Sequence, residues 1–276
     1  MERLQQAIER ARQERQGTIG NVPSFENRHQ APPPVVQRKS PELKRTGPPP
    51  NPITYRQSKI VALNDTHMEQ HRVIAGRSGD ERVEAYRQLR TQVLHTLDEN
   101  NWNTLAITSP LKNAGKTLTS VNLAISLAKE VNHSVLLVDL DLSHPDVHAT
   151  LGVDIEYGLL DVLHGHCSME QALINPSMQR LLVLPCRPTQ EYSSELLSSP
   201  DMRDLLNDVK SRYESRIVIF DLPPLLRNDD ALKFTPFVDA TLMVVEAGRT
   251  TPEELERATH LMKNANLIGT ILNKAK

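Results

Sequence analysis

The residues best suited to chemistry lie in the stretch Ile107–Ala124, where an apolar run, a short loop ending in Gly115-Lys116-Thr117 and a helical pattern follow one another. A helix N-terminus presents unpaired N–H groups and the positive end of its dipole, so it binds phosphate. In the pattern G-x-x-x-x-G-K-[ST], the Lys reaches the outer phosphates of a nucleotide and the hydroxyl residue binds Mg²⁺. We therefore expect a nucleotide site formed by Ala114, Gly115, Lys116, Thr117 and Leu118.

The pattern is incomplete, because Pro110 stands where its first Gly belongs. Asn113 tolerates a left-handed backbone better than other residues with side chains, so it can help the loop to curl. A strand-like run before the loop and apolar residues at helical spacing after it favour the nucleotide site. The alternative is an ordinary surface turn in which the same residues cap a helix.

Three aspartates follow apolar runs that are typical of buried strands. SVLLVDLD ends in Asp139 and Asp141, and RIVIFDLPP contains Asp221. Ligands of parallel sheets bind at the carboxyl ends of strands, so these carboxylates would lie beside the loop as a Mg²⁺ cluster. Thr117 would bind the metal and Asp221 would hold a coordinated water, while Asp139 and Asp141 are alternatives for contacting the metal or accepting a proton. Each aspartate alone could instead cap a helix or turn.

The elements that must position these residues alternate along the chain. Apolar runs begin near residues 104, 134, 181, 216, 240 and 267, and helical patterns precede or separate them. Continuous apolar strands separated by helices predict a mostly parallel sheet covered on both faces. We expect an α/β fold, a three-layer α/β/α sandwich, over residues 58–276, with residues 58–64 as a candidate edge strand.

The first part of the chain has a different composition. Residues 1–17 favour a short helix with a narrow apolar side. Residues 18–57 contain Pro-Pro-Pro twice, which predicts a disordered proline-rich linker. A ligand for a proline-recognition domain is the alternative for this segment.

Bulk composition limits the function classes. With a net charge of -2 over 276 residues, no nucleic-acid partner is expected. Cys167 and Cys186 are too few for a disulfide framework or a zinc site and favour a reducing compartment. No window approaches the ~18 consecutive apolar residues of a membrane span, and no signal-peptide core is visible, so we expect a cytoplasmic protein. Membrane association would then come through a partner.

In the order of its motifs the chain resembles the bacterial tyrosine kinases of the polysaccharide-synthesis type, which are related to the MinD and ParA ATPases. SPLKNAGKT is similar to the Walker A loop, VLLVDLDLSHP to the second aspartate motif and IVIFDLPP to the Walker B strand of this family. The resemblance covers about residues 80–276. It implies a P-loop NTPase fold, ATP and Mg²⁺ as cofactors, and phosphate transfer to protein tyrosines with Lys116, Asp139 and Asp141 as catalytic residues.

Further assignments rest on the same resemblance. Glu84, Arg87 and Arg90 match a helix motif that joins family subunits, which implies a homo-oligomer; the alternative is a local pair of Glu84 with Arg87. Asn273 falls where related ATPases contact adenine, although an Asn ending a strand is often a turn residue. The first residues and the linker resemble a branch that accompanies exopolysaccharide export. That branch implies a membrane chain-length protein as partner, a peripheral location at the inner face of the plasma membrane, and a phosphotyrosine phosphatase as a further candidate partner.

The chain departs from the family pattern in its loop and in its tyrosines. The segment 112–114 replaces the usual Pro-Gly-Glu, Leu111 stands where MinD-like proteins have a lysine, and Ser143-His144 stands where basic residues are common. Many family members carry a cluster of tyrosines near the C-terminus, whereas the tyrosines of the given sequence are scattered: Tyr55, Tyr86, Tyr157, Tyr192 and Tyr213. Tyr55, in the linker, is the best placed to enter another subunit's site; the alternative is an ordinary exposed tyrosine. The alternative function is therefore an ATP-binding switch, either a catalytically weak kinase homologue or a MinD-like ATPase, that regulates polysaccharide export by nucleotide-dependent assembly.

Overall fold

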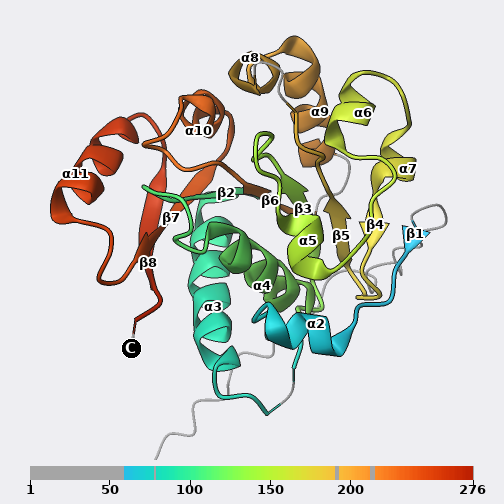
Figure 1. Cartoon of the computed structure of the whole chain (residues 1–276), viewed down its shortest axis with the longest axis horizontal. Coiled ribbons are helices and arrows are strands. Elements are labelled where there is room, and N and C mark those ends of the chain that lie inside the picture. The colour runs from blue at the N-terminus through green and yellow to red at the C-terminus, as the bar shows by residue number, and fades with distance from the viewer. Residues whose placement is uncertain (1–58, 78, 190–192, 212–214, 276) are drawn as a thin grey trace, which may run out of the picture. The chain divides into compact units, whose positions relative to one another are not determined.

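The computed structural model describes residues 59–77, 79–189, 193–211 and 215–275 (Figure 1). The expected N-terminal helix at 1–17 and linker at 18–57 lie outside the described residues, and so does Tyr55. No helix in the part of the chain that the structure describes combines the length and apolar character needed to cross a membrane.

Within the described residues the strands form one sheet of eight, in the order β1-β4-β5-β3-β6-β2-β7-β8. Neighbouring strands run parallel except β4 and β5, so β1 and β4 run opposite to the other six. The expected mostly parallel sheet and the edge strand near residue 59 are confirmed. The strands are β1 (Lys59–Ile60), β2 (Thr104–Thr108), β3 (Ser134–Asp139), β4 (Ile174–Asn175), β5 (Leu181–Leu184), β6 (Arg216–Asp221), β7 (Ala240–Glu246) and β8 (Leu267–Asn273).

Helices cover both faces of this sheet, as expected for a three-layer sandwich (Figure 1). One face packs against α2 (Asp65–Gln70), α3 (Val83–Asn100), α4 (Lys116–Ala128) and α5 (Val147–Leu151). The other packs against α6 (Leu159–Leu163), α7 (Met169–Ala172), α8 (Ser193–Leu197), α9 (Pro200–Ser211), α10 (Asp230–Phe234) and α11 (Pro252–Leu261), with a 3-10 turn at Thr235–Phe237. The short elements β4, α5, α6 and α7 fall in stretches for which the sequence predicts no element.

Side-chain alternation explains why the central strands are apolar throughout. In β2, Leu105 and Ile107 enter the core beneath α3 and α4, whereas Ala106 enters the core on the opposite face. Since both faces are covered, every residue of β2, β3 and β6 is buried. This explains the continuous apolar runs, which are typical of parallel sheets.

The strand order decides which carboxyl ends meet. β6 lies between β2 and β3, so Asp221 is opposite Ile107 on one side and Asp139 on the other. The loop before α4 leaves β2 at this point. The sheet therefore brings the two aspartate motifs and the Gly115 loop to one edge.

The central strand should carry much of the stability. Ile219 in β6 is fully buried, whereas Ile60 in edge strand β1 is 68% exposed. Ile219→Ala should lower the free energy of unfolding by about 2–5 kcal/mol, because it removes buried methyl groups and leaves a cavity. Ile60→Ala should change it by less than about 0.5 kcal/mol. Urea denaturation followed by circular dichroism measures both, and equal effects would contradict this account of the core.

Candidate active site

The loop before α4 curls through two left-handed residues. Asn113 has φ 63° and Gly115 has φ 96°, so the expectation that Asn113 adopts this conformation is confirmed. Gly115 is the N-cap residue of α4. Pro110, at the place of the missing Gly, uses its carbonyl to accept the N–H of Leu226 at 3.2 Å. The loop is thus tied to the segment that follows β6.

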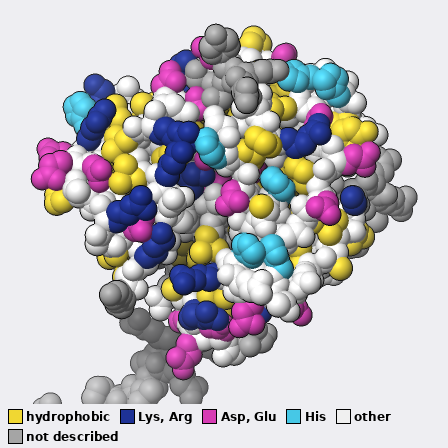
Figure 2. Space-filling view, viewed as in Figure 1, with side chains coloured by type: hydrophobic (Ala, Val, Ile, Leu, Met, Phe, Trp, Pro, Cys, Tyr) yellow, Lys and Arg dark blue, Asp and Glu magenta, His cyan; other side chains and the backbone are white. Residues whose placement is uncertain are grey.

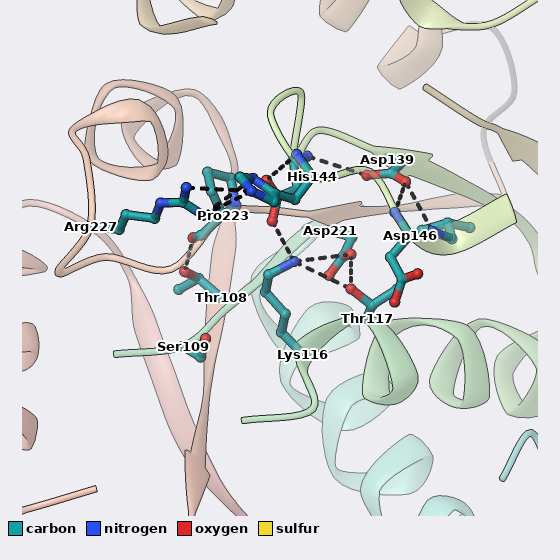
Figure 3. Close-up of polar contacts among 12 residues, drawn as sticks. Thr108, Ser109, Lys116, Thr117, Asp139, His144, Asp146, Asp221, Pro223 and Arg227 are labelled. Carbon is teal, nitrogen blue, oxygen red and sulfur yellow. Dashed lines mark hydrogen bonds and ion pairs between the residues drawn. The ribbon is translucent and has the colours of Figure 1, made fainter. Parts of the chain in front are cut away.

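The Lys116 ammonium lies among carboxylates (Figure 3). Its Nζ is 2.8 Å from Asp141 Oδ2 and 3.6 Å from Asp221 Oδ2, and the side chain is 11% exposed. Burial alone would lower the pKa of Lys116, but Asp221 and Asp141 outweigh burial and raise it. The lysine is therefore charged, and the two carboxylates hold its ammonium near the N-terminus of α4.

Asp221 accepts hydrogen bonds from two hydroxyl groups of α4. Thr117 Oγ1 donates to Asp221 Oδ2 at 2.6 Å, and Ser120 Oγ donates to Asp221 Oδ1 at 2.9 Å. Burial raises the pKa of Asp221, opposed by Lys116 and by these hydroxyls. Sequence reasoning missed Ser120, although its position one helical turn after Lys116 was the available signal.

Asp139 has a different environment from the other two aspartates. Its Oδ2 accepts the backbone N–H groups of Asp146 and Val147, each at 3.0 Å, and its Oδ1 accepts that of Asp141 at 3.2 Å. These contacts order the turn that leads into α5, and this is how a capping carboxylate behaves. Burial and the nearby Asp221 raise the pKa of Asp139. A metal-binding or proton-accepting role for Asp139 stays a prediction.

The donor set suits Mg²⁺. Within the described residues no group of three or more His, Cys, Asp or Glu side chains could hold a metal ion. Mg²⁺, however, keeps several waters and commonly takes only one or two protein ligands, all oxygen. Thr117 Oγ1 and the Asp221 carboxylate are adjacent oxygen donors at the tip of β6, so the residues present fit this ion.

A cavity of about 810 Å³ is lined by Lys116 and Thr117. Its wall also includes Leu118, Asp141, His144 and two further cations, Lys112 and Arg227. On this face of the molecule, Lys and Arg side chains gather with His side chains beside them (Figure 2). Sequence reasoning missed Arg227, because nothing in its local sequence indicates that the chain returns it to the loop.

The comparisons with known proteins are consistent with this geometry. The model of the family described as AAA domain matches residues 104–270. Tyrosine-protein kinase YwqD of Bacillus subtilis (strain 168) is 33% identical over 195 residues, which span 70% of this chain and 81% of that protein. This chain belongs to the bacterial tyrosine-protein kinases. Its enzyme class is that of a protein-tyrosine kinase, as the resemblance implied.

Two further relatives extend the comparison. The kinase domain of Escherichia coli tyrosine kinase ETK has a TM-score of 0.67 at 28% identity, covering 80% of this chain and 88% of that one. A Klebsiella pneumoniae relative, named a tyrosine-protein kinase "in cps region", is 30% identical over 193 residues, or 69% of this chain. This chain spans only 26% of the length of that relative.

A more distant likeness is of the fold alone. The MinD protein of Pyrococcus horikoshii, solved with Mg-ADP, has a TM-score of 0.51 at 23% identity, covering 62% of this chain and 69% of that one. The expected P-loop NTPase fold is thereby confirmed.

In this kinase two residues at the end of β8, Asn273 and Lys274, hold the loop before α4 by hydrogen bonds, and we call this pair of contacts the clamp. Asn273 Nδ2 donates to the Ala114 carbonyl at 2.8 Å, and Lys274 Nζ donates to the Asn113 carbonyl at 2.7 Å. Lys274 also pairs with Glu246 at 3.0 Å. The contact of Asn273 with adenine stays a prediction, but Asn273 does lie against the predicted nucleotide loop.

The predicted oligomerisation residues lie on α3, away from this cluster. Glu84 and Arg87 form an exposed pair at 3.4 Å. Arg90 instead points to α4, where it donates to the Ser126 carbonyl at 3.1 Å and pairs with Glu130 at 3.0 Å. Arg90 therefore joins two helices of the same chain, while Glu84 and Arg87 remain accessible.

The clamp predicts an unequal response of two glycines. Gly115 and Gly248 both have positive φ, but a Cβ at Gly115 would collide with the Asn273 amide, whereas a Cβ at Gly248 meets nothing within 4 Å. Gly115→Ala should therefore destabilise the kinase by about 1 kcal/mol more than Gly248→Ala, because the Asn273 hydrogen bond is also lost. Urea denaturation measures both values. In an Asn273→Ala background the extra loss should disappear, and its persistence there would contradict the clamp.

Proposed function

We propose that this kinase binds ATP at residues 114–118 and transfers its terminal phosphoryl group to a tyrosine hydroxyl of a protein. The observation that carries the proposal is the Lys116 ammonium, held by Asp141 and Asp221 at the N-terminus of α4. Outer phosphates would accept hydrogen bonds from Lys116 and from the loop N–H groups, both of which stabilise charge on the transferred group.

Of Asp139 and Asp141, Asp141 is the better candidate for contact with the tyrosine hydroxyl. It lines the cavity. Its partner, the Lys116 ammonium, would move to the phosphates when nucleotide binds. The freed carboxylate then accepts the tyrosine proton as the new oxygen–phosphorus bond forms and the bond to the departing ADP breaks. Thr117 and Asp221 would hold Mg²⁺, which neutralises charge on the phosphate oxygens. Asp139 would act by ordering the turn between Asp141 and α5.

We further propose that the reaction helps to control exopolysaccharide or capsule polymerisation and export. The name of the Klebsiella pneumoniae relative supports this assignment, as does the resemblance of the first residues to export-associated kinases. A membrane chain-length protein would be the partner and would place the kinase at the inner face of the plasma membrane. A phosphotyrosine phosphatase would reverse the modification.

The acceptor tyrosine stays a prediction. Tyr86 and Tyr157 are partly buried and pack against the two cores, so neither is presented to another subunit as it stands. Tyr55, Tyr192 and Tyr213 lie outside the described residues. Tyr55 remains a candidate acceptor, and an ordinary exposed tyrosine remains the alternative.

Phosphotyrosine formation tests the kinase assignment. We expect labelled ATP with Mg²⁺ to label tyrosine, and Lys116→Ala to reduce labelling by about 100-fold or more, because the charge on the transferred group loses its main protein cation. Lys263→Ala, an exposed lysine after α11, is the matched control and should retain full labelling. Mass spectrometry would identify the tyrosine.

The outcome of that assay separates the two functions. If nucleotide binds but no tyrosine is labelled, with or without the cytoplasmic part of the membrane partner, the kinase activity is refuted. The ATP-binding switch would then take its place.

We also propose that the kinase forms a homo-oligomer through the accessible pair of Glu84 and Arg87 on α3. Arg87→Glu places two acidic side chains at three-residue spacing and should favour the monomer, because a charged contact between subunits becomes repulsive. Arg257→Glu on α11 makes the same charge change at another exposed helical position. Sedimentation velocity gives the mass. An equal distribution of species in both variants would exclude this surface.

A further inference from the structure

The cavity rim carries an arginine that the motifs of this kinase do not account for. Arg227 follows β6 by six residues and lines the same cavity as Lys116 and Asp141. We propose that Arg227 binds the terminal phosphate of the nucleotide, with the His144 ring holding its guanidinium over the site. This proposal rests on the proposed function, since it assigns a further residue to the same phosphate site.

The backbone before Arg227 is fastened to the strand and loop that bind phosphate. Thr108 Oγ1 donates to the Pro223 carbonyl at 2.7 Å, and the N–H of Leu225 donates to the Ser109 carbonyl at 2.8 Å. With the contact of Leu226 to Pro110, three hydrogen bonds fix this segment against residues 108–110. Arg227 is therefore presented from a rigid base, although its own side chain is exposed.

His144 meets the Arg227 guanidinium from the opposite wall (Figure 3). Arg227 Nη1 lies 3.2 Å from His144 Nδ1 and 3.4 Å from Nε2. The N–H of His144 is anchored by Asp141, whose carbonyl is 3.0 Å away and whose Oδ1 is 3.2 Å away. Burial, Arg227 and Lys112 lower the pKa of His144, which favours the neutral ring beside the guanidinium. Asp141 thus contacts Lys116 on one side and the turn that carries His144 on the other.

Besides Lys116, the cavity wall carries two cations that can contact an anion. Lys116 itself faces two carboxylates, those of Asp141 and Asp221, and Asp146 also lines the cavity. Lys112 and Arg227 also line the cavity, and in the described residues neither forms an ion pair. A guanidinium presents a planar fork of donors that matches two oxygens of one phosphate. In the phosphate-loop pattern the lysine reaches the outer phosphates. Because Arg227 lines the same cavity as Lys116, it suits the outermost phosphate.

The test compares a triphosphate with a diphosphate. With Mg²⁺ present, calorimetry on the full chain should show that Arg227→Ala weakens binding of a non-hydrolysable ATP analogue about 10-fold, the loss of a charged hydrogen bond. ADP, which lacks the terminal phosphate, should bind as tightly as it does to the wild type. Arg227→Lys should restore part of the affinity for the triphosphate. Arg257→Ala, a distant exposed arginine, should change neither affinity.

Other outcomes would overturn the proposal. An equal loss of affinity for ADP and for the analogue would mean that Arg227 attracts both nucleotides only by its positive charge, without contacting the terminal phosphate. Lys112→Ala should show how large this electrostatic contribution is. Unchanged affinity for both nucleotides, with a raised KM for an acceptor peptide, would assign Arg227 to the acceptor instead. Lys116→Ala tests the proposed phosphate site separately from the role of Arg227. If the Lys116→Ala variant binds both nucleotides as tightly as the wild type, the proposed phosphate site is wrong, whatever Arg227→Ala does.

Discussion

The contact of the Lys116 ammonium with Asp141 and Asp221 is the interaction on which the rest of the site depends. Charges as deeply buried as these are stable only when they are paired and hydrogen-bonded. Thr117 and Ser120 complete the set by donating to Asp221, so α4, β3 and β6 are joined through polar groups at one edge of the sheet. A nucleotide would exchange partners within this cluster, because its phosphates compete with the carboxylates for the ammonium.

Strand order explains why the cluster exists. Had β3 neighboured β2 directly, Asp221 would not lie between the phosphate loop and the second aspartate motif. With β6 in the centre, Asp221 at its carboxyl end contacts α4. The segment that follows, up to Arg227, is hydrogen-bonded to the loop. Asn273 and Lys274, at the end of β8, donate hydrogen bonds to the same loop. One strand arrangement thus brings together the residues that we propose to contact the phosphate, the metal and the acceptor tyrosine.

Local features of this arrangement could be predicted from the sequence, and contacts between distant segments could not. The apolar runs gave the buried strands, and Asn113 and Gly115 gave the left-handed turns, because these depend on neighbouring residues alone. The contrast between Asp139, which orders the turn into α5, and Asp141, which pairs with Lys116, depends on side-chain directions that strand spacing does not define. Arg227 reaches the loop only because Leu225 and Leu226 pair with residues more than 100 positions earlier.

The most direct test of the central claim is the Mg²⁺ dependence of ADP binding, measured by calorimetry for the wild type and for Asp221→Asn. If Asp221 is the carboxylate that supports the metal beside Thr117, Mg²⁺ should tighten ADP binding by the wild type, and Asp221→Asn should lose that increase while still binding ADP in EDTA. Asp201→Asn, at the exposed start of α9, should behave as the wild type. A full Mg²⁺-dependent increase in Asp221→Asn would contradict the assignment of this cluster as the metal–nucleotide site.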